Sequence, residues 1–227
     1  VLLLATNKKL VETLKNIYKI EELRKRIAYT LGLLLVFRLG CFVVIPGIDP
    51  NTLGEGSALA DQMNSNTLLG LLDVFSGGAF ANAAILALGV MPYITASIII
   101  QLLGMMVPAV QKLQKEGESG RRKLNQWTRL LTIGVLCIQA PAYVANLYRE
   151  MPQAFVYGGT IYFYAYATVI LIAGTLFTMW LGERITDKGI GNGVSMIIMI
   201  GIVARLPQAL LAEFTARVST STGSLIM

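Results

Sequence analysis

The chain has 227 residues, of which 55% are hydrophobic and only 14% are charged, and its mean hydropathy is +0.63. A soluble domain would carry about 25% charged residues, so these values exclude an ordinary soluble protein and indicate a membrane protein. The sequence has no histidine, and its two cysteines, Cys41 and Cys137, lie far apart. We therefore expect no metal site, no disulfide, no cofactor and no enzymatic activity.

Long apolar runs predict membrane-spanning helices, because a span needs about 20 mostly apolar residues. The first run is interrupted only by Arg38. The five predicted spans lie at 27–48, at 82–103 within the uncharged segment 74–111, at 130–148, within 151–182, and at 189–204 with an extension over 206–212.

Basic residues orient these spans, because Lys and Arg gather on the cytoplasmic side of a membrane. They are abundant in segment 1–26 and in the predicted cytoplasmic loop 112–129, absent from 49–73, and reduced to Arg149 between the third and fourth spans. The alternation predicts five crossings, with the N terminus in the cytoplasm and the C terminus outside. Segment 1–26 is amphipathic and basic, which is typical either of a helix on anionic lipid or of a solvated leader helix.

A short apolar helix, predicted at 67–75, precedes the second span and is too short to cross a membrane. It contains Asp73 and is followed by Gly77 and Gly78, which can form a hinge. Backbone at membrane depth that does not span must be buried in protein or line a cavity. The pattern fits a re-entrant element or stopper, and it fits equally an amphipathic helix on the outer membrane surface.

Four segments closely resemble the SecY family, the central subunit of the bacterial protein-conducting channel. They are "FRLGCFVVIPGIDP" (37–50), "VFSGGAFANAAILALGVMPYITASIIIQLL" (74–103), "KEGESGRRKLNQWTR" (115–129) and "TMWLGERITDKGIGNGVSMIIMIGIVA" (178–204). The resemblance implies an all-α polytopic membrane protein, with five transmembrane helices and a re-entrant plug helix, that forms one half of an inverted-repeat channel.

On this resemblance the five-helix half spans residues 27–212, with the plug at about 66–81, and residues 213–227 form an external tail that leads to a second half. The implied function is translocation of unfolded secretory polypeptides across the bacterial cytoplasmic membrane, with lateral release of membrane-protein segments. The implied partners are SecE, SecG, the SecA ATPase or the ribosome, nascent chains and anionic lipids. The alternative is a secondary transporter with broken helices, which usually needs acidic residues at mid-membrane.

The resemblance also assigns roles to individual residues. The implied pore ring consists of Val90, Ile94, Val194 and Ile198. The plug and its hinge comprise Leu68, Leu69, Leu72, Asp73, Phe75, Gly77 and Gly78, and the lateral gate includes Thr95 and Gln139. The basic residues Lys115, Arg121, Arg122 and Lys123 are implied as a secondary contact for a cytoplasmic partner.

Three further residues carry expectations that come from local chemistry. Arg38 lies inside the first span, and we expect a structural role in which it snorkels outward or meets carbonyl groups. Pro92 lies inside the second predicted span, where a proline removes a backbone hydrogen bond and kinks the helix. Asn192 precedes the fifth span and is suited to cap it.

Overall fold

The computed structural model describes residues 20–49, 67–150, 154–155 and 161–223. These residues form seven helices, and their only β-type pairings are two isolated bridges. The helices are α2 (Glu21–Gly40), α4 (Thr67–Ser76), α5 (Met91–Met106), α6 (Pro108–Lys115), α7 (Glu118–Glu150), α8 (Ile161–Lys188) and α9 (Gly193–Gly223). The chain is therefore all-helical within its described part, as the sequence predicts.

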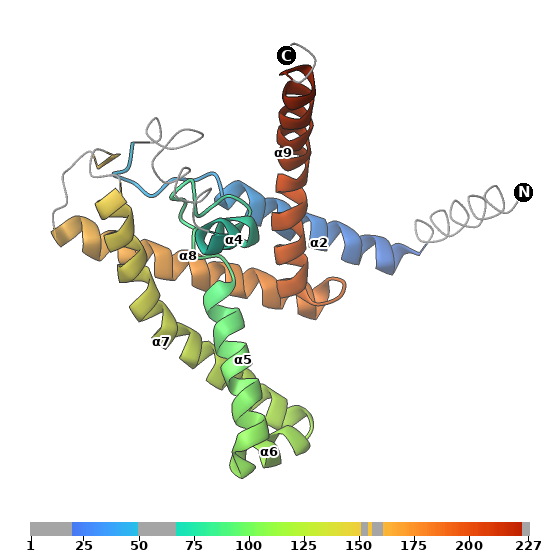
Figure 1. Cartoon of the computed structure of the whole chain (residues 1–227). Coiled ribbons are helices and arrows are strands. Elements are labelled where there is room, and N and C mark those ends of the chain that lie inside the picture. Colours follow the sequence, from blue (N-terminus) through green and yellow to red (C-terminus); the bar gives the residue numbers. More distant parts are fainter. Residues whose placement is uncertain (1–19, 50–66, 151–153, 156–160, 224–227) are drawn as a thin grey trace, which may run out of the picture.

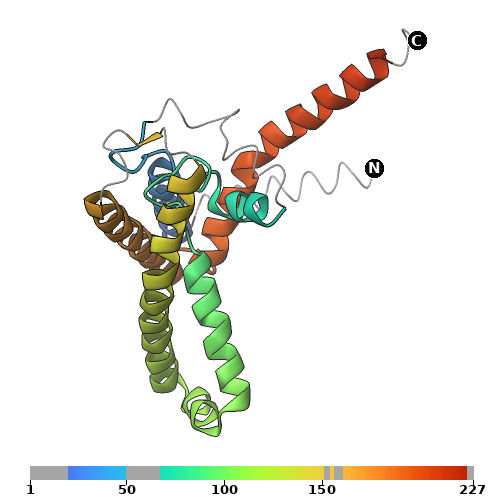
Figure 2. The ribbon, with the colours of Figure 1, turned by 60° about the vertical axis from the view of Figure 1, so that its left-hand side comes forward.

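The helices form two arms around a common centre (Figure 1). In one arm α5 and α7 lie side by side and α6 joins their far ends, which both views show (Figure 2). In the other, α8 packs against α2, α7 and the beginning of α9, while the second half of α9 projects away from the rest of the molecule. The short helix α4 lies at the centre against α9.

The centre is built on segment 77–90, which connects α4 to α5 and consists mostly of turns. Its backbone pairs with the chain that follows α2: Ile45 donates to the Ala83 carbonyl at 3.0 Å, and Ile85 donates to the Val43 carbonyl at 2.9 Å. Two hydrophobic clusters meet on this segment. One is shared with α7 and the first half of α8, and the other with α2, the end of α8 and the beginning of α9. An irregular segment can be buried here because its polar backbone groups find partners.

The second predicted span differs from the structure. Residues 82–90 form turns, and α5 begins only at Met91, which places Pro92 in its first turn instead of at a mid-helix kink. This position suits proline, because the first turn needs no donor from it and its fixed φ is already helical. The expectation of a kink at Pro92 was wrong. The sharp bend lies at Val107, where the axes of α5 and α6 turn by 102° directly before Pro108.

Other boundaries also differ from the sequence prediction. The first helix ends at Gly40 and turns follow it, while segment 112–129 is largely helical, with a turn at Gly117 between α6 and α7. Helix α9 continues to Gly223 and so includes most of the predicted external tail. The predicted cap is confirmed, because the Asn192 side-chain oxygen accepts the Val194 and Ser195 N–H groups at 3.1 and 3.3 Å.

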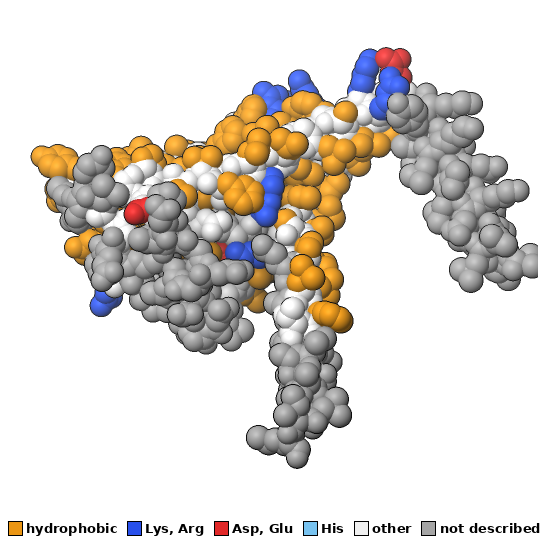
Figure 3. Space-filling model, turned by 90° about the horizontal axis from the view of Figure 1, so that it is seen from above, with side chains coloured by type: hydrophobic (Ala, Val, Ile, Leu, Met, Phe, Trp, Pro, Cys, Tyr) orange, Lys and Arg blue, Asp and Glu red, His pale blue; other side chains and the backbone are white. Residues whose placement is uncertain are grey.

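By length and composition, α7 and α8 can each cross a membrane, and the bent pair α5–α6 can supply a third crossing. The apolar part of α9, Gly193–Pro207, is shorter. Figure 3 shows hydrophobic side chains over much of the described surface, with charged side chains in a few separate places. The predicted number of five spans is not reached by these criteria within the described residues and stays a prediction.

Gly174 provides a test of this packing, because a Cβ atom at this position would collide with the Ile85 carbonyl of the central segment. We expect Gly174→Ala to lower the unfolding midpoint in detergent, since overpacking of a buried contact costs about 1–3 kcal/mol. Gly134→Ala is the matched control, because a methyl group there meets no atom within 4 Å. Equal midpoints for the two variants would contradict the close approach of α8 to segment 77–90.

Candidate functional site

The site is centred on α4 and the tight turn that follows it. Among the α4 side chains, Leu72 and Phe75 are half-buried and Asp73 is only 2% exposed, whereas the side chains of Leu68 and Leu69 lie outside the described residues. Gly77 and Gly78 follow with φ values of 67° and 93°. Residues with a Cβ atom rarely adopt this conformation, so the two glycines allow the chain to reverse directly after α4.

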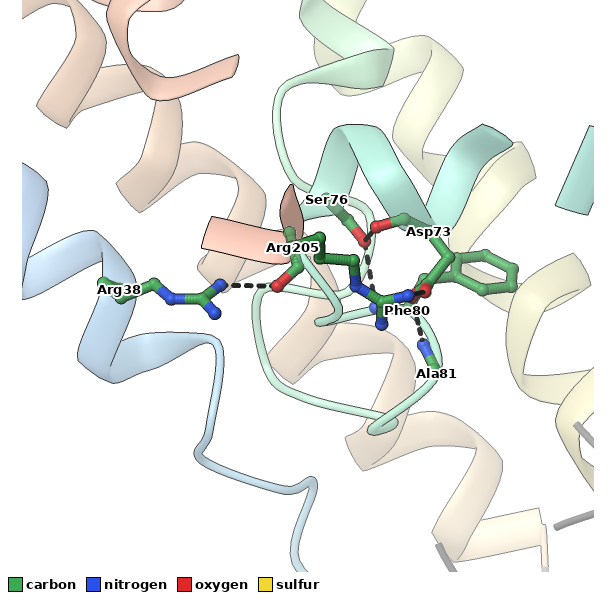
Figure 4. A network of polar contacts seen from close by, with 7 residues as sticks. Arg38, Asp73, Ser76, Phe80, Ala81 and Arg205 are labelled. Atoms are coloured by element: carbon green, nitrogen blue, oxygen red, sulfur yellow. Dashed lines mark hydrogen bonds and ion pairs between the residues drawn. The ribbon is translucent and has the colours of Figure 1, made fainter. Parts of the chain in front are cut away.

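Asp73 organises the turn through both carboxylate oxygens (Figure 4). Oδ2 lies 2.5 Å from the Arg205 guanidinium of α9, and Oδ1 accepts the Ala81 N–H at 2.8 Å. The Asp73 main-chain carbonyl accepts bonds from the Ser76 hydroxyl and the Gly78 N–H, both at 3.0 Å. Burial raises the pKa of the Asp73 carboxyl, and the Ala81 hydrogen bond and the Arg205 charge act in the opposite direction.

Arg38 holds the same turn from the other side (Figure 4). Its Nη1 donates to the Gly77 carbonyl at 2.5 Å, and its guanidinium lies 5.0 Å from the centre of the Phe42 ring. The Tyr143 hydroxyl of α7 donates to the Phe80 carbonyl at 2.9 Å. The turn after α4 is therefore bound by side chains from α2, α7 and α9, and Arg38 meets a carbonyl group as the structural interpretation expects.

Helix α9 approaches this turn at Gly201. A Cβ atom at Gly201 would lie 3.1 Å from the Phe75 carbonyl oxygen, and one at Gly77 would lie 3.0 Å from the Gly201 Cα. Since real Cβ atoms seldom come this close to backbone, glycine is needed on both sides of the contact. The two backbones therefore touch one helical turn before Arg205.

The four predicted ring residues come together in one hydrophobic cluster. Val90 is 3% exposed within the cluster, and Ile94, Val194 and Ile198 are half-buried and pack against it. Val194 and Ile198 are four residues apart on α9, and the same face continues to Gly201 and Arg205 at helical spacing. One face of α9 thus carries two predicted ring residues and both of the groups that contact the turn after α4.

An open cavity of about 510 Å³ lies beside this cluster, between α5, α7, α8 and the beginning of α9. Ile94, Val194 and Ile198 line it, and the remaining wall is largely polar. An ion pair at its edge joins α7 to α8, in which Arg129 donates two bonds of 2.7 Å to the Glu183 carboxylate. The cavity therefore has hydrophobic residues where it meets the predicted ring and hydrophilic residues elsewhere.

A second cavity of about 300 Å³ lies between α4, α5 and α7. Thr95 and Gln139, the two predicted gate residues, both line it, together with Leu72 and Tyr143. Its lining is mostly apolar, and the Thr95 hydroxyl donates to the Met91 carbonyl of its own helix at 3.1 Å. The structure therefore brings the two gate residues together, next to α4.

The predicted partner-contact residues are Lys115, Arg121, Arg122 and Lys123, and all four are exposed at the junction of α6 and α7. Arg122 forms an exposed ion pair with Glu118 at 3.0 Å, and exposed pairs of this kind contribute little to stability. Within the described residues, no three Cys, Asp or Glu side chains gather as metal ligands would.

Sequence reasoning missed Arg205, Gly201 and Tyr143. Arg205 falls between the two apolar parts of the fifth predicted span, 189–204 and 206–212, and was treated only as a break between them. The signal was its spacing, because residues 194, 198, 201 and 205 follow the 4-3-4 pattern of one helical face.

Comparison with known proteins identifies the fold family. The SecY family model matches residues 84–227. The chain is 47% identical over 206 residues to the protein translocase subunit SecY of Buchnera aphidicola subsp. Schizaphis graminum, covering 89% of this chain and 46% of that protein. It is 49% identical over 191 residues to the subunit of Escherichia coli K12, covering 83% of this chain and 42% of that protein.

The protein translocase subunit SecY of Vibrio cholerae is 48% identical over 191 residues, covering 84% of this chain and 42% of that protein. The chain thus spans about half the length of the curated relatives that it matches. The family model covers more than half of this chain. The chain belongs to the SecY family.

Proposed function

We propose that this multi-pass membrane protein forms the pore-bearing half of a protein-conducting channel, through which unfolded secretory polypeptides cross the bacterial cytoplasmic membrane. The observation that carries the proposal is the gathering of Val90, Ile94, Val194 and Ile198 in one cluster between α5 and α9. A hydrophobic constriction closes a pore to ions because water leaves a narrow apolar passage. Aliphatic side chains of this kind can also move apart for a polypeptide and close again after it.

The cavity of about 510 Å³ serves in this proposal as part of the vestibule that leads to the constriction. Its polar wall solvates an extended polypeptide, whose backbone groups need partners until they leave the channel. The aliphatic residues at its inner end form the gate. The proposed channel therefore has a hydrated vestibule that leads to an apolar constriction, and the constriction excludes water when it is closed.

Helix α4 acts in this proposal as the plug. Asp73 and the turn after α4 are held by side chains from α2, α7 and α9, and these contacts must break when a plug moves away. This supports a docked element over an amphipathic helix lying free on the outer membrane surface. The plug reaches about residues 66–81 in the sequence prediction, and residue 66 lies outside the described part of the chain.

The cavity lined by Thr95 and Gln139 is the proposed inner wall of a lateral gate. It is mostly apolar and adjoins α4, so a hydrophobic segment entering it would also contact the plug through Leu72. The opposite wall would come from the second half of the channel. Five spans, a cytoplasmic N terminus and an external C terminus complete the proposed topology.

The proposed partners are SecE and SecG in the membrane, and SecA or a ribosome on the cytoplasmic side. The exposed basic residues at the α6–α7 junction suit the acidic surface of a motor protein or the phosphates of ribosomal RNA, as well as anionic lipid. The alternative function, a secondary transporter, gains no support from the relatives described above, all of which are named protein translocase subunits.

Photocrosslinking probes at the four ring positions test the pore directly. In the complete protein, with a secretory polypeptide stalled halfway through, we expect strong crosslinks from Val90, Ile94, Val194 and Ile198, because a chain in the constriction must touch the whole ring. Val169 is the control position, because its side chain is 64% exposed on α8. Crosslinks from Val169 but from none of the four would show that the ring is misassigned.

The basic junction gives a separate test. We expect the quadruple change of Lys115, Arg121, Arg122 and Lys123 to Gln to weaken binding of the complete protein to SecA or ribosomes several-fold at low salt, with a smaller loss at high salt, since salt screens exposed charges. Binding measured at two salt concentrations checks this. Arg149→Gln, at the other end of α7, is the matched control, and an equal loss in this variant would count against a localised contact.

A further inference from the structure

We propose that the ion pair between Asp73 and Arg205 is a latch that holds the plug in its closed position. The proposal rests on the channel function above. It adds one contact whose free energy opposes movement of the plug. Asp73 belongs to α4, the element that must move, and Arg205 belongs to α9, which carries two of the ring residues. The pair therefore joins the moving part to the wall of the pore.

The environment of the pair makes it a strong contact. The Asp73 side chain is 2% exposed and the Arg205 side chain is 34% exposed. A buried carboxylate with one partner removed is left with an uncompensated charge, whereas an exposed pair can exchange its partner for water. Arg205 thus gives the latch a side that water can reach, whereas the buried Asp73 carboxylate depends in the closed position on Arg205 and the Ala81 N–H to compensate its charge.

The geometry around the pair ties it to the turn after α4. A Cβ atom at Gly78 would lie 2.9 Å from an Arg205 guanidinium nitrogen, so the guanidinium rests directly on the hinge. The second Asp73 oxygen accepts the Ala81 N–H, which closes the loop between residues 73 and 81. Moving α4 away from α9 therefore breaks the ion pair and uncovers the hinge in the same step.

Arg38 is a second and independent point of attachment. It donates to a main-chain carbonyl at Gly77, and among the described residues it forms no ion pair, so its contact survives neutralisation of Asp73. The Asp73–Arg205 pair is the part of the attachment that depends on two opposite charges. Neutralising Asp73 or Arg205 therefore removes the ion pair but keeps the Arg38 contact, so the effect of the ion pair can be measured separately.

The experiment measures the ion leak of the resting channel. The complete translocase is placed in planar bilayers without substrate, and its conductance is compared for Asp73→Asn, Arg205→Gln and the double variant. We expect about a tenfold rise in leak for each single variant, because a hydrogen bond between charged groups stabilises by at least that factor. The double variant should leak less than the product of the two single effects, since both act on one contact.

Glu22→Gln is the matched control, because it breaks the exposed Glu22–Arg26 ion pair at the beginning of α2 and should leave the leak unchanged. Each latch variant should still translocate a precursor, which a misfolded protein would not do. Should Asp73→Asn fail to assemble, Arg205→Gln alone decides the matter, because the Arg205 side chain is partly exposed. Wild-type leak in the assembled variants, or leaks that simply multiply in the double variant, would overturn the latch. Failure of the wild-type protein to translocate at all would instead overturn the proposed channel function.

Discussion

A carboxylate that is only 2% exposed needs partners, and the partners of Asp73 set the arrangement of the centre of this molecule. Arg205 supplies an opposite charge from α9, and the Ala81 N–H supplies a hydrogen bond from the turn. Because these partners come from different parts of the chain, satisfying one side chain fixes the position of α4, the path of the turn and the rotation of α9. The two hydrophobic clusters pack around this connection.

The central segment shows why an irregular backbone can occupy the core of a membrane protein. Residues 77–90 have no regular helix to satisfy their polar groups, and in an apolar environment each unsatisfied group is costly. The segment solves this with turns, with two bonds to the chain after α2, and with acceptors for the Tyr143 hydroxyl and Arg38. Small residues make the arrangement possible, since Ala83 and Ala84 are fully buried and leave room for the neighbouring helices.

Much of this architecture could be predicted from the sequence. Apolar runs indicate which segments lie in lipid, and basic loops indicate the side of the membrane that they face. The short helix, its glycine hinge, the Asn192 cap and the membrane character all follow from local patterns. The helix boundaries around Pro92 and Pro108 did not, because a proline fits either a kink or a first turn, and tertiary packing decides between them. Arg205 was missed for a related reason: its role exists only once Asp73 is brought beside it from 132 positions earlier in the chain.

The single face of α9 that carries Val194, Ile198, Gly201 and Arg205 has a mechanical consequence. A rigid helix cannot turn one of these residues without turning the others, because adjacent residues are fixed at about 100° around its axis. In the proposed channel, rotation of α9 about its own axis would withdraw two side chains from the proposed constriction and, in the same movement, carry Gly201 and Arg205 away from the proposed plug. In that proposal, widening of the pore and release of the plug would be coupled through one rigid helix, without a separate signal between them.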